Sequence, residues 1–416
     1  MNNTLTLGGM PPLARDTRTA LGLLEGLRHG RLEVRLPDGT THQFGTGERT
    51  VTLQVHDEAV FGAVLARGDI GFGEAYLDGQ WDTPDLTALL TLLAQNREVL
   101  KRAVYGSWRA LLAARLRHWA NRNSRAGSRR NIMAHYDLGN DFYQQWLDET
   151  MSYSAALYSD GADLATAQRA KYRRILRQLG AKPGERVLEI GCGWGGFAEM
   201  AAADGLAVTG LTLSPAQLEW AQRRVATADQ PEGRRTPRSG GPEQGEGWSK
   251  APHFRLQDYR DTAERYDHIV SIEMFEAVGE RWWPSYFQTV ARSLKPGGRA
   301  VVQSITIRDD LFAAYRRGTD FIQQHVFPGG MLPSRAAFRK AAAQQKLAVA
   351  DEFAFGRDYA RTLAEWRLAF ETNWERIAPL GFDQRFRRLW RFYLAYCEAG
   401  FLAGTIDVVQ FELRHA

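Results

Sequence analysis

The sequence predicts an α/β protein in which a mostly parallel, doubly wound sheet follows a smaller α+β unit. After residue 185, short apolar segments that indicate strands alternate with segments that indicate helices, and this alternation is typical of parallel sheets. The first of these strands runs into a glycine-rich turn. Hydrophobic residues make up 44% and charged residues 24% of the 416 residues. This ordinary globular composition excludes a globally disordered or collagen-like chain.

The first hundred residues predict the smaller unit. Residues 32–37 and 50–55 alternate apolar and polar side chains, as half-buried strands do. Asp38-Gly39 predicts the turn that follows the first strand. Residues 82–95 predict a helix that begins near a Thr-Pro pair.

A basic segment follows this unit. Between Glu98 and Asp137 the chain has no acidic residue, and tryptophans and leucines are interleaved with its basic residues. A basic amphipathic helix of this kind is typical of elements that lie on a membrane surface, and a solvated linker helix is the alternative. Each such charge held near an anionic leaflet contributes about 1 kcal/mol. The basic residues are Lys101, Arg102, Arg109, Arg115, Arg117, Arg122, Arg125, Arg129 and Arg130.

The larger unit is predicted strand by strand. Apolar runs predict five parallel strands, at 186–190, 207–213, 253–257, 266–272 and 299–307. A helix is predicted at 197–204, and Ser214-Pro215 predicts the N-cap and first residue of the next. Residues 308–402 predict mostly helix, and 406–413 predict a closing edge strand. Residues 229–252 are rich in Gly, Pro, Glu and Arg and predict a disordered insertion.

These patterns predict three segments: an N-terminal lipid- or membrane-associated domain at 1–115, a basic linker at 116–135, and a catalytic domain at 136–416. The formal charge of +5 does not indicate nucleic-acid binding but suits local contacts with anionic surfaces. Two cysteines cannot form a disulfide framework, so we expect a reducing compartment. No apolar run is long enough to span a bilayer, and residues 1–19 lack a secretory pattern. We therefore expect a cytoplasmic protein.

The strongest chemical signal is the glycine loop at 187–197. Four glycines in six positions allow sharp turns and a close approach of the backbone to a ligand, and ligands bind beyond the carboxyl ends of parallel strands. Residues 191–196 also fit a dinucleotide fingerprint, but the second strand ends in Leu-Thr-Leu-Ser without the expected acid. The form Leu-Glu-Ile-Gly-Cys-Gly resembles the first motif of class I S-adenosylmethionine-dependent methyltransferases.

Seven motifs in order extend this resemblance. They lie at 135–143, 151–154, 190–196, 211–217, 274–276, 327–333 and 393–397. With them the sequence resembles the cyclopropane-fatty-acyl-phospholipid synthase family, which includes the mycolic acid cyclopropane synthases. The resemblance begins near residue 131, and residues 1–115 look like the family's N-terminal extension. It implies a class I methyltransferase fold, a Rossmann-like sheet with helical lid insertions.

The resemblance also implies which residues bind S-adenosylmethionine. The matching positions are Tyr153 and Ser154, the methionine-side loop of Gly191, Gly193, Trp194, Gly195 and Gly196, the ribose-side Thr212 and Gln217, and the adenine-side Gln257 and Asp258. Without the resemblance, Thr212 and Gln217 would be interpreted as a helix cap and a solvated helix face. We expect no metal, because the histidines near the motifs, His135 and His325, have no partner at a metal-binding spacing.

The reaction implied by the resemblance adds a methylene across the cis double bond of an unsaturated phospholipid acyl chain. An alkene is a poor nucleophile and must be aligned with the methyl donor, and the resulting carbocation needs a dry pocket in which aromatic rings can stabilise it. Aromatic candidates, each of which alone is more simply explained as core, are Tyr143, Trp146, Phe275, Trp282, Trp283, Phe321, Trp366 and Phe370.

A base must then remove a proton. In family members the base is a bicarbonate held by Cys, Glu, His and Tyr side chains. Glu276 and Tyr359 match the Glu and Tyr positions, whereas Ala155 and Gln303 replace the Cys and the His. Gln303 can still donate a hydrogen bond to an anion, but Ala155 offers no polar side chain. Bicarbonate therefore stays open as a cofactor, and so does ring closure.

The catalytic prediction rests on Glu276, as an anion-site ligand or as the direct base, with Tyr359 and Gln303 beside it. Cys397 matches a cysteine assigned to the family's active site, but its apolar helical setting favours a structural role. The alternatives are a methyl or methylene branch without ring closure, and methylation of a soluble small molecule.

The expected partners are a membrane phospholipid with an unsaturated chain and the anionic surface that carries it. We expect no nucleic acid and allow for a homodimer. The expected location is cytoplasmic, peripheral on the inner face of the membrane.

Overall fold

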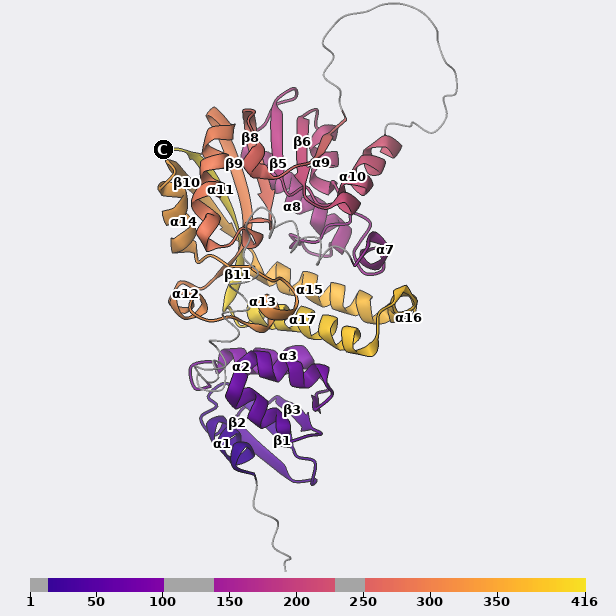
Figure 1. Cartoon of the computed structure of the whole chain (residues 1–416), viewed down its shortest axis with the longest axis vertical. Helices are drawn as coiled ribbons and strands as arrows, with labels where there is room; N and C mark the ends of the chain where they lie inside the picture. Colours follow the sequence, from indigo (N-terminus) through magenta and orange to yellow (C-terminus); the bar gives the residue numbers. More distant parts are fainter. Residues whose placement is uncertain (1–13, 101–137, 229–250) are drawn as a thin grey trace, which may run out of the picture. The chain divides into compact units, whose positions relative to one another are not determined.

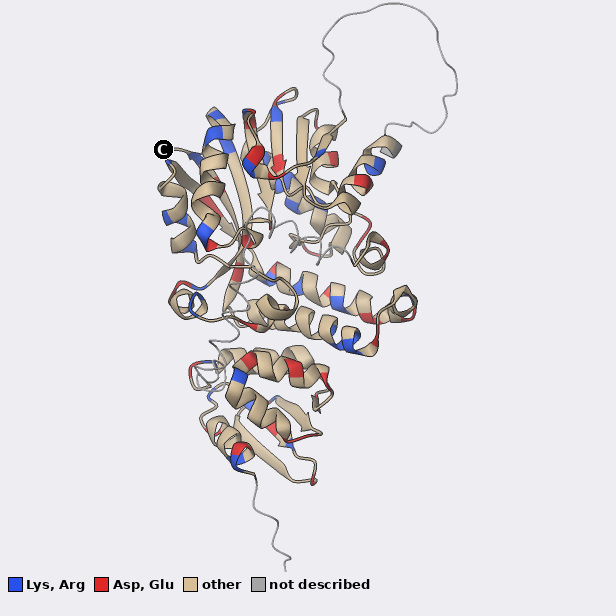
Figure 2. Cartoon of the chain, in the orientation of Figure 1, with Lys and Arg blue, Asp and Glu red and all other residues tan. Residues whose placement is uncertain are grey.

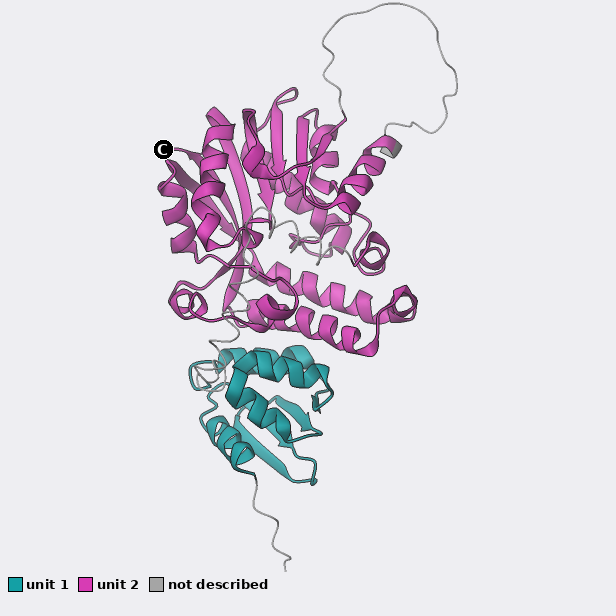
Figure 3. Cartoon of the chain, in the orientation of Figure 1, with its two compact units in different colours: residues 1–113 teal, residues 114–416 magenta. Residues whose placement is uncertain are grey.

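The computed structural model describes residues 14–100, 138–228 and 251–416. The predicted basic linker, nearly all of the predicted insertion at 229–252 and the start of the motif at 135–143 lie outside these described residues. The chain divides into two compact units, Met1–Ala113 and Ala114–Ala416 (Figure 3). Within the described ranges, no helix has the length and apolar character needed to cross a membrane.

The first unit contains a four-stranded sheet in the order β2-β1-β3-β4. Its strands are β1 (Gly30–Arg35), β2 (Thr41–Thr46), β3 (Thr50–Val55) and β4 (Trp81–Asp82), and its helices are α1 (Arg15–Leu24), α2 (Ala59–Leu77) and α3 (Leu86–Gln95). Leu32, Val34 and Trp81 are fully buried, so the predicted alternation in β1 does mark a core face. The predicted helix begins later than Thr83-Pro84, because the Asp85 carboxylate accepts a hydrogen bond from Ala88 N at 2.9 Å and caps α3.

The second unit is built on a seven-stranded mixed sheet in the order β10-β11-β9-β8-β5-β6-β7. The strands are β5 (Arg186–Ile190), β6 (Ala207–Thr212), β7 (His253–Leu256), β8 (Tyr266–Ile272), β9 (Leu294–Ile307), β10 (Leu347–Ala354) and β11 (Ile406–His415). Strands β5 to β9 pair in parallel, and β11 is antiparallel to both β9 and β10. The five predicted parallel strands and the predicted fold class are confirmed.

The strand predicted at 406–413 is present as β11, but its predicted position at the edge of the sheet was wrong. Strand β11 lies inside the sheet, between β9 and β10, and six consecutive residues of it are buried. The edge strand is β10, which falls within the segment predicted to be mostly helical. Its sequence, Leu-Ala-Val-Ala-Asp-Glu-Phe-Ala, has three alanines and two acids, residues that strands disfavour, so it gave no strand signal.

Helices cover both faces of the sheet (Figure 1), and alternate side chains of its strands pack against these two layers. Val187, Val208 and Val270 face one core, which is covered by α8 (Leu164–Leu179), α9 (Gly196–Ala203) and α10 (Pro215–Ala228). Leu188 and Ile269 face the other, which is covered by α11 (Trp283–Ser293) and α14 (Arg335–Ala343). The sheet is thus covered on both faces, as its apolar strands require.

A third group of elements forms an aromatic core beyond the carboxyl ends of the strands. Helices α15 (Gly356–Thr372) and α17 (Gln384–Leu402) pack against each other. Both carry charged residues (Figure 2), and Arg387 and Arg391 of α17 bind Glu371 of α15. The shorter helices are α7 (Asn140–Tyr143), α12 (Asp309–Tyr315), α13 (Phe321–His325) and α16 (Trp374–Ile377), with the 3-10 turns η1 (Tyr259–Asp261), η2 (Phe275–Ala277), η3 (Glu280–Trp282) and η4 (Ala378–Leu380).

Candidate functional site

The glycine loop between β5 and α9 is held in a conformation that needs glycine. Gly191, Gly193 and Gly195 have positive φ angles of 84°, 50° and 84°, which L side chains rarely adopt. A Cβ at Gly191 would lie 2.8 Å from the Met274 Cγ. The amides of residues 191 and 192 both donate to the Leu211 carbonyl, at 3.0 and 2.8 Å, so the loop is tied to β6.

Trp194 connects the loop to α7. Its indole Nε1 donates to Asn140 Oδ1 at 2.8 Å, and Asn140 in turn donates to the Ala216 carbonyl at 3.1 Å. The loop is therefore fixed on both sides, by β6 and by the start of α10.

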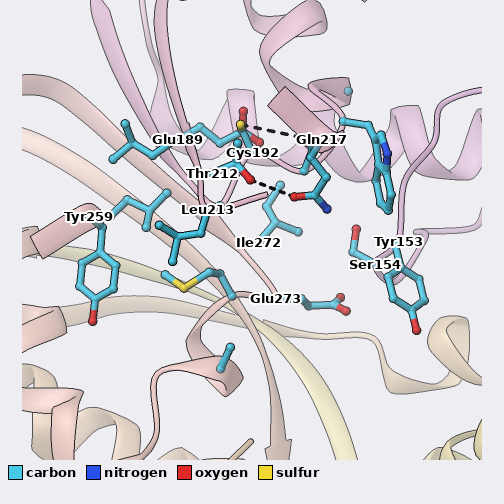
Figure 4. A pocket seen from close by; sticks show the side chains of 18 of the residues that line it. Tyr153, Ser154, Glu189, Cys192, Thr212, Leu213, Gln217, Tyr259, Ile272 and Glu273 are labelled. Carbon is cyan, nitrogen blue, oxygen red and sulfur yellow. Dashed lines mark hydrogen bonds between the residues drawn. The ribbon is translucent and has the colours of Figure 1, made fainter. Parts of the chain in front are cut away.

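The end of β6 supplies a polar pair. Thr212 Oγ1 donates to Gln217 Oε1 at 2.9 Å, and both side chains are buried. Because the amide oxygen is used in this bond, the Gln217 NH2 group faces the pocket (Figure 4). Ser214 Oγ accepts from the Gln217 backbone N–H at 3.3 Å and caps α10. The capping role therefore belongs to Ser214, whereas Thr212 and Gln217 both line the pocket.

The end of β7 supplies the next pair. The Gln257 N–H donates to the Thr212 carbonyl at 3.0 Å. This bond places Gln257 and Asp258 on the same side of the pocket as Thr212. The Asp258 carboxylate accepts two hydrogen bonds from the Arg260 guanidinium, at 2.8 and 2.6 Å. All predicted cofactor residues except Gly195 line one pocket, and Gly195 instead caps α9.

One residue of this pocket, Glu273, was not predicted from the sequence as a site residue. Glu273 directly follows β8, lines the pocket and has a positive φ of 50°. Its Oε1 accepts hydrogen bonds from the Ala155 backbone N–H at 2.8 Å and from Gln303 Nε2 at 2.7 Å. Its Oε2 accepts from the Tyr359 hydroxyl at 2.6 Å. Figure 4 shows this carboxylate pointing toward the end of the pocket where Tyr153 and Ser154 lie.

A chain of polar side chains fixes the orientation of the Gln303 amide. Arg174 can only donate, and its Nη1 donates to Gln410 Oε1 at 2.6 Å. Gln410 Nε2 then donates to Gln303 Oε1 at 3.0 Å, so the Gln303 NH2 group must point at Glu273. Gln303 and Gln410 are fully buried, and their amides have no alternative arrangement that keeps these bonds.

Glu276 lies next to this group but outside the residues that line the pocket. Its Oε1 accepts hydrogen bonds from the Ile305 N–H and, at 3.1 Å, from the Ser304 hydroxyl. Burial, and then the neighbouring charge of Glu273, raise the pKa of Glu276 to about 8. Glu276 therefore keeps its proton at neutral pH, whereas Glu273 is the carboxylate that three donors stabilise.

Two other predicted catalytic residues differ in their surroundings. Tyr359 lies on α15 and donates to Glu273, and burial raises the pKa of its hydroxyl, so it remains a donor. Cys397 lies on α17, where it packs against the aromatic core and does not line the pocket. Burial raises the pKa of its thiol well above the ordinary value, which keeps it protonated and unreactive.

Lys171 is a second residue that the sequence did not single out. It is fully buried on α8, and its Nζ donates to Ser154 Oγ at 2.5 Å and to Gln168 Oε1 at 2.6 Å. Burial lowers the pKa of Lys171 to about 8. The negative charges of nearby acids act in the opposite direction, and Glu273 contributes most among them. Lys171 thus positions Ser154 and balances the charge of Glu273.

Aromatic side chains surround Tyr153. Its ring lies 5.6, 5.4 and 5.3 Å from the rings of Tyr143, Trp146 and Trp366, and its hydroxyl is 2.6 Å from the Tyr393 hydroxyl. Of the other predicted aromatic candidates, Phe370 belongs to this same core. Phe275, Trp282 and Trp283 instead pack in the core between the sheet and helices α11 and α14, and Phe321 contacts Phe392.

In the described ranges, no three His, Cys, Asp or Glu side chains come together in a way that could hold a metal ion. The pocket instead presents hydrogen-bonding groups suited to an organic ligand. It offers an open loop of positive-φ glycines, the inward-facing amide of Gln217 and the strand-end residues Gln257 and Asp258.

The mixed sheet, with this loop after β5 and a polar pair after β6, has the fold of a class I S-adenosylmethionine-dependent methyltransferase. The chain belongs to the mycolic acid cyclopropane synthetase family, whose sequence model matches residues 123–240 and 243–411. With that family it shares the modification of fatty acyl chains.

Three relatives illustrate this membership. The chain is 38% identical over 396 residues to the tuberculostearic acid methyltransferase UfaA1 of Mycobacterium tuberculosis, with 92% of this chain and 88% of that protein covered. It is 33% identical over 366 residues to the cyclopropane-fatty-acyl-phospholipid synthase of Escherichia coli, with 88% of each covered. The structure of the mycolic acid cyclopropane synthase CmaA1 complexed with SAH and CTAB matches with a TM-score of 0.60 and 31% identity, over 68% of this chain and 97% of that one.

Proposed function

We propose that this methyltransferase transfers a methyl group from S-adenosylmethionine to the cis double bond of an unsaturated acyl chain in a membrane phospholipid, and that a cyclopropane ring is the product. The observation that carries the proposal is the meeting of three features at one place. The cofactor pocket, the hydrogen-bonded Glu273 carboxylate and a core of aromatic rings adjoin at Tyr153 and Glu273. The relatives that are named as fatty-acid methyltransferases and cyclopropane synthases support the same substrate class.

The cofactor supplies a methyl group made electrophilic by a sulfonium. The glycine loop with Trp194 would hold its methionine part, Thr212 and Gln217 its ribose, and Gln257 and Asp258 its adenine. The fixed loop and the buried polar pair serve to orient the cofactor, because an alkene reacts only when it is aligned with the carbon that it attacks.

The aromatic residues act on the acyl chain. Tyr143, Trp146 and Trp366 are buried around Tyr153 and keep water away from this end of the pocket. Their ring faces can stabilise the positive charge that forms on the chain when the double bond is methylated. A soluble polar substrate would gain nothing from such surroundings.

A methylene branch is the second candidate product. Loss of a proton from the added methyl closes a ring, whereas the same loss after a hydride shift leaves an exocyclic methylene, and both products gain one CH2. The observation that favours the branch is the altered anion site, in which Ala155 and Gln303 contact a carboxylate of the chain itself. A saturated methyl branch would need a separate hydride donor.

Vesicles and a labelled methyl donor test the proposal. The protein is incubated with methyl-labelled S-adenosylmethionine and vesicles of dioleoyl phospholipid, with dipalmitoyl vesicles as the control. Label in the acyl chains of the unsaturated lipid alone is the expected result, and proton NMR of the released fatty acid separates ring protons from vinylidene protons. Label found only in a water-soluble product would contradict the proposal.

The interaction with an anionic leaflet remains part of this proposal. It rests on the basic residues between 101 and 130, which lie outside the described residues, and on a substrate that is itself embedded in a membrane. The homodimer and the inner-face location stay predictions from the sequence.

A further inference from the structure

The Glu273 carboxylate accepts hydrogen bonds from three donors at the end of the pocket beside the aromatic core. The three donors are the Ala155 N–H, the Gln303 amide and the Tyr359 hydroxyl, at 2.8, 2.7 and 2.6 Å. Ala155, Gln303 and Tyr359 occupy three of the positions that the family resemblance associates with a bound bicarbonate. A carboxylate and a bicarbonate are both planar anions with two charged oxygens, so one set of donors cannot hold both.

We propose that Glu273 is the general base of the reaction, a carboxylate built into the chain that takes the place of a bound bicarbonate. This inference rests on the proposed function, since it names the group that receives the proton in that reaction. It also predicts that the enzyme works without bicarbonate and does not bind it.

The hydrogen bonds around Glu273 leave one oxygen able to accept a proton. Oε1 accepts two hydrogen bonds and Oε2 accepts one, from Tyr359. A carboxylate oxygen can accept two, so among the described residues Oε2 keeps a lone pair. Glu273 also lines the pocket, and its carboxylate points toward the end of the pocket beside Tyr153 (Figure 4).

The strained backbone conformation at Glu273 indicates that this position has a functional role. A φ of 50° costs a residue with a Cβ on the order of 1 kcal/mol, and such strain persists where the surroundings enforce it and concentrates at functional sites. Here the left-handed turn directly after β8 directs the carboxylate to the Ala155, Gln303 and Tyr359 donors.

The neighbouring charges give Glu273 the properties of a base. Glu276 remains protonated, so it does not compete for the charge, and Lys171 provides a buried positive partner. Burial raises the pKa of Glu273 although its hydrogen bonds oppose the rise. A carboxylate with a raised pKa accepts a proton more readily than an exposed one, and the three donors stabilise its ionised form.

The reaction balances with no further reagent. The π electron pair of the alkene forms the new C–C bond to the methyl carbon, and the electrons of the broken C–S bond stay on sulfur. The adjacent acyl carbon is left positively charged. Glu273 Oε2 then takes a proton from the added methyl, and the electrons of that C–H bond close the ring. After a hydride shift from the methylated carbon to the cationic carbon, the same electrons form the methylene double bond instead. The proton leaves later to water.

The first experiment measures methyl transfer to dioleoyl vesicles in buffer freed of carbon dioxide, with and without added bicarbonate. Wild-type turnover should change less than about twofold, and Glu273→Gln should lower turnover by about 100-fold or more with the KM for S-adenosylmethionine nearly unchanged. The matched control is Glu219→Gln, which removes an exposed carboxylate on α10 that pairs with Arg223, and it should behave as the wild type. Wild-type activity that requires bicarbonate, or full activity in Glu273→Gln, would overturn the proposal.

The second experiment uses Glu273→Gly. Glycine suits the positive φ at this position, so the variant should fold, and it leaves three donors around an empty space. Added bicarbonate or formate should restore turnover about tenfold or more in this variant and in no other. In the absence of any methyl donor, calorimetry should detect bicarbonate binding to Glu273→Gly and none to the wild type.

The calorimetric result distinguishes a failure of the proposed function from a failure of the inference about Glu273. A wild type that labels no lipid, while bicarbonate binds only to Glu273→Gly, refutes the proposed function but supports the occupied anion site. A wild type that labels lipid and binds bicarbonate as tightly as Glu273→Gly leaves the proposed function standing and overturns the inference.

Discussion

Replacing Glu276 with glutamine should stabilise the protein, and the gain should grow with pH. Glu276 is buried beside Glu273, and its pKa is raised from 4.5 to about 8, first by burial. An acid with a raised pKa must keep its proton in the folded state, whereas the unfolded chain releases it above about pH 4.5. Stability from this group is therefore complete at low pH and is lost as the pH rises from about 4.5 to about 8.

The size of the effect follows from the pKa difference. Each unit of pKa difference corresponds to about 1.4 kcal/mol, so at pH 7 the folded state bears a cost on the order of 3 kcal/mol from Glu276. Glutamine carries no charge at any of these pH values, and its Oε1 can still accept hydrogen bonds from the Ile305 N–H and the Ser304 hydroxyl. Glu276→Gln should thus raise the melting temperature on the order of 5 °C at pH 7 and leave it nearly unchanged at pH 5.

The assay is thermal and urea unfolding at pH 5, 6, 7 and 8, followed by tryptophan fluorescence. Glu219→Gln again serves as the control, because an exposed carboxylate gives no such trend. A gain of equal size at every pH, or a loss at pH 7, would show that Glu276 is ionised in the folded protein, and the assignment of the charge to Glu273 would fail with it.

Three further predictions concern the loop, the thiol and the basic segment. Gly191→Ala, which forces a Cβ to within 2.8 Å of Met274 Cγ at a positive φ, should weaken S-adenosylmethionine binding about tenfold or more, as calorimetry would measure; unchanged affinity would remove the loop from the cofactor site. Cys397→Ala should keep turnover within about threefold, because its buried thiol stays protonated, and a large loss would assign it a chemical role. Neutralising four arginines together should weaken the binding of the protein to vesicles, measured by co-sedimentation, and reduce the salt dependence of that binding. The four are Arg122, Arg125, Arg129 and Arg130. Undiminished binding would make the segment a linker.

The parallel strands could be predicted because burial on both faces forces continuous apolar runs between glycines. Strand β5 is the clearest case, since four of its five residues are buried and Gly191, with a positive φ, directly follows it. Strand β10 could not be predicted in the same way. Its alanines and acids fit an exposed edge that is held by its pairing with β11, and that pairing joins segments about sixty residues apart.

The candidate site was predicted where local motifs define it and overlooked where distant residues do. Tyr153, Thr212 and Gln217 belong to short motifs, and each lines the pocket. Glu273 was overlooked because the motif that follows it drew attention to Glu276. A carboxylate directly after a buried strand, at the carboxyl end of a parallel sheet, was the available signal.

The hydrogen-bond donors around each carboxylate decide which of the two carries the negative charge. Glu276 has a single oxygen in hydrogen bonds, and its Oε2 is buried with no partner among the described residues, so ionising it is costly. Glu273 meets three donors and a buried lysine, so it can hold the charge. Two buried carboxylates this close cannot both be ionised cheaply. The proton therefore stays on Glu276, and the free carboxylate is the one that faces the substrate.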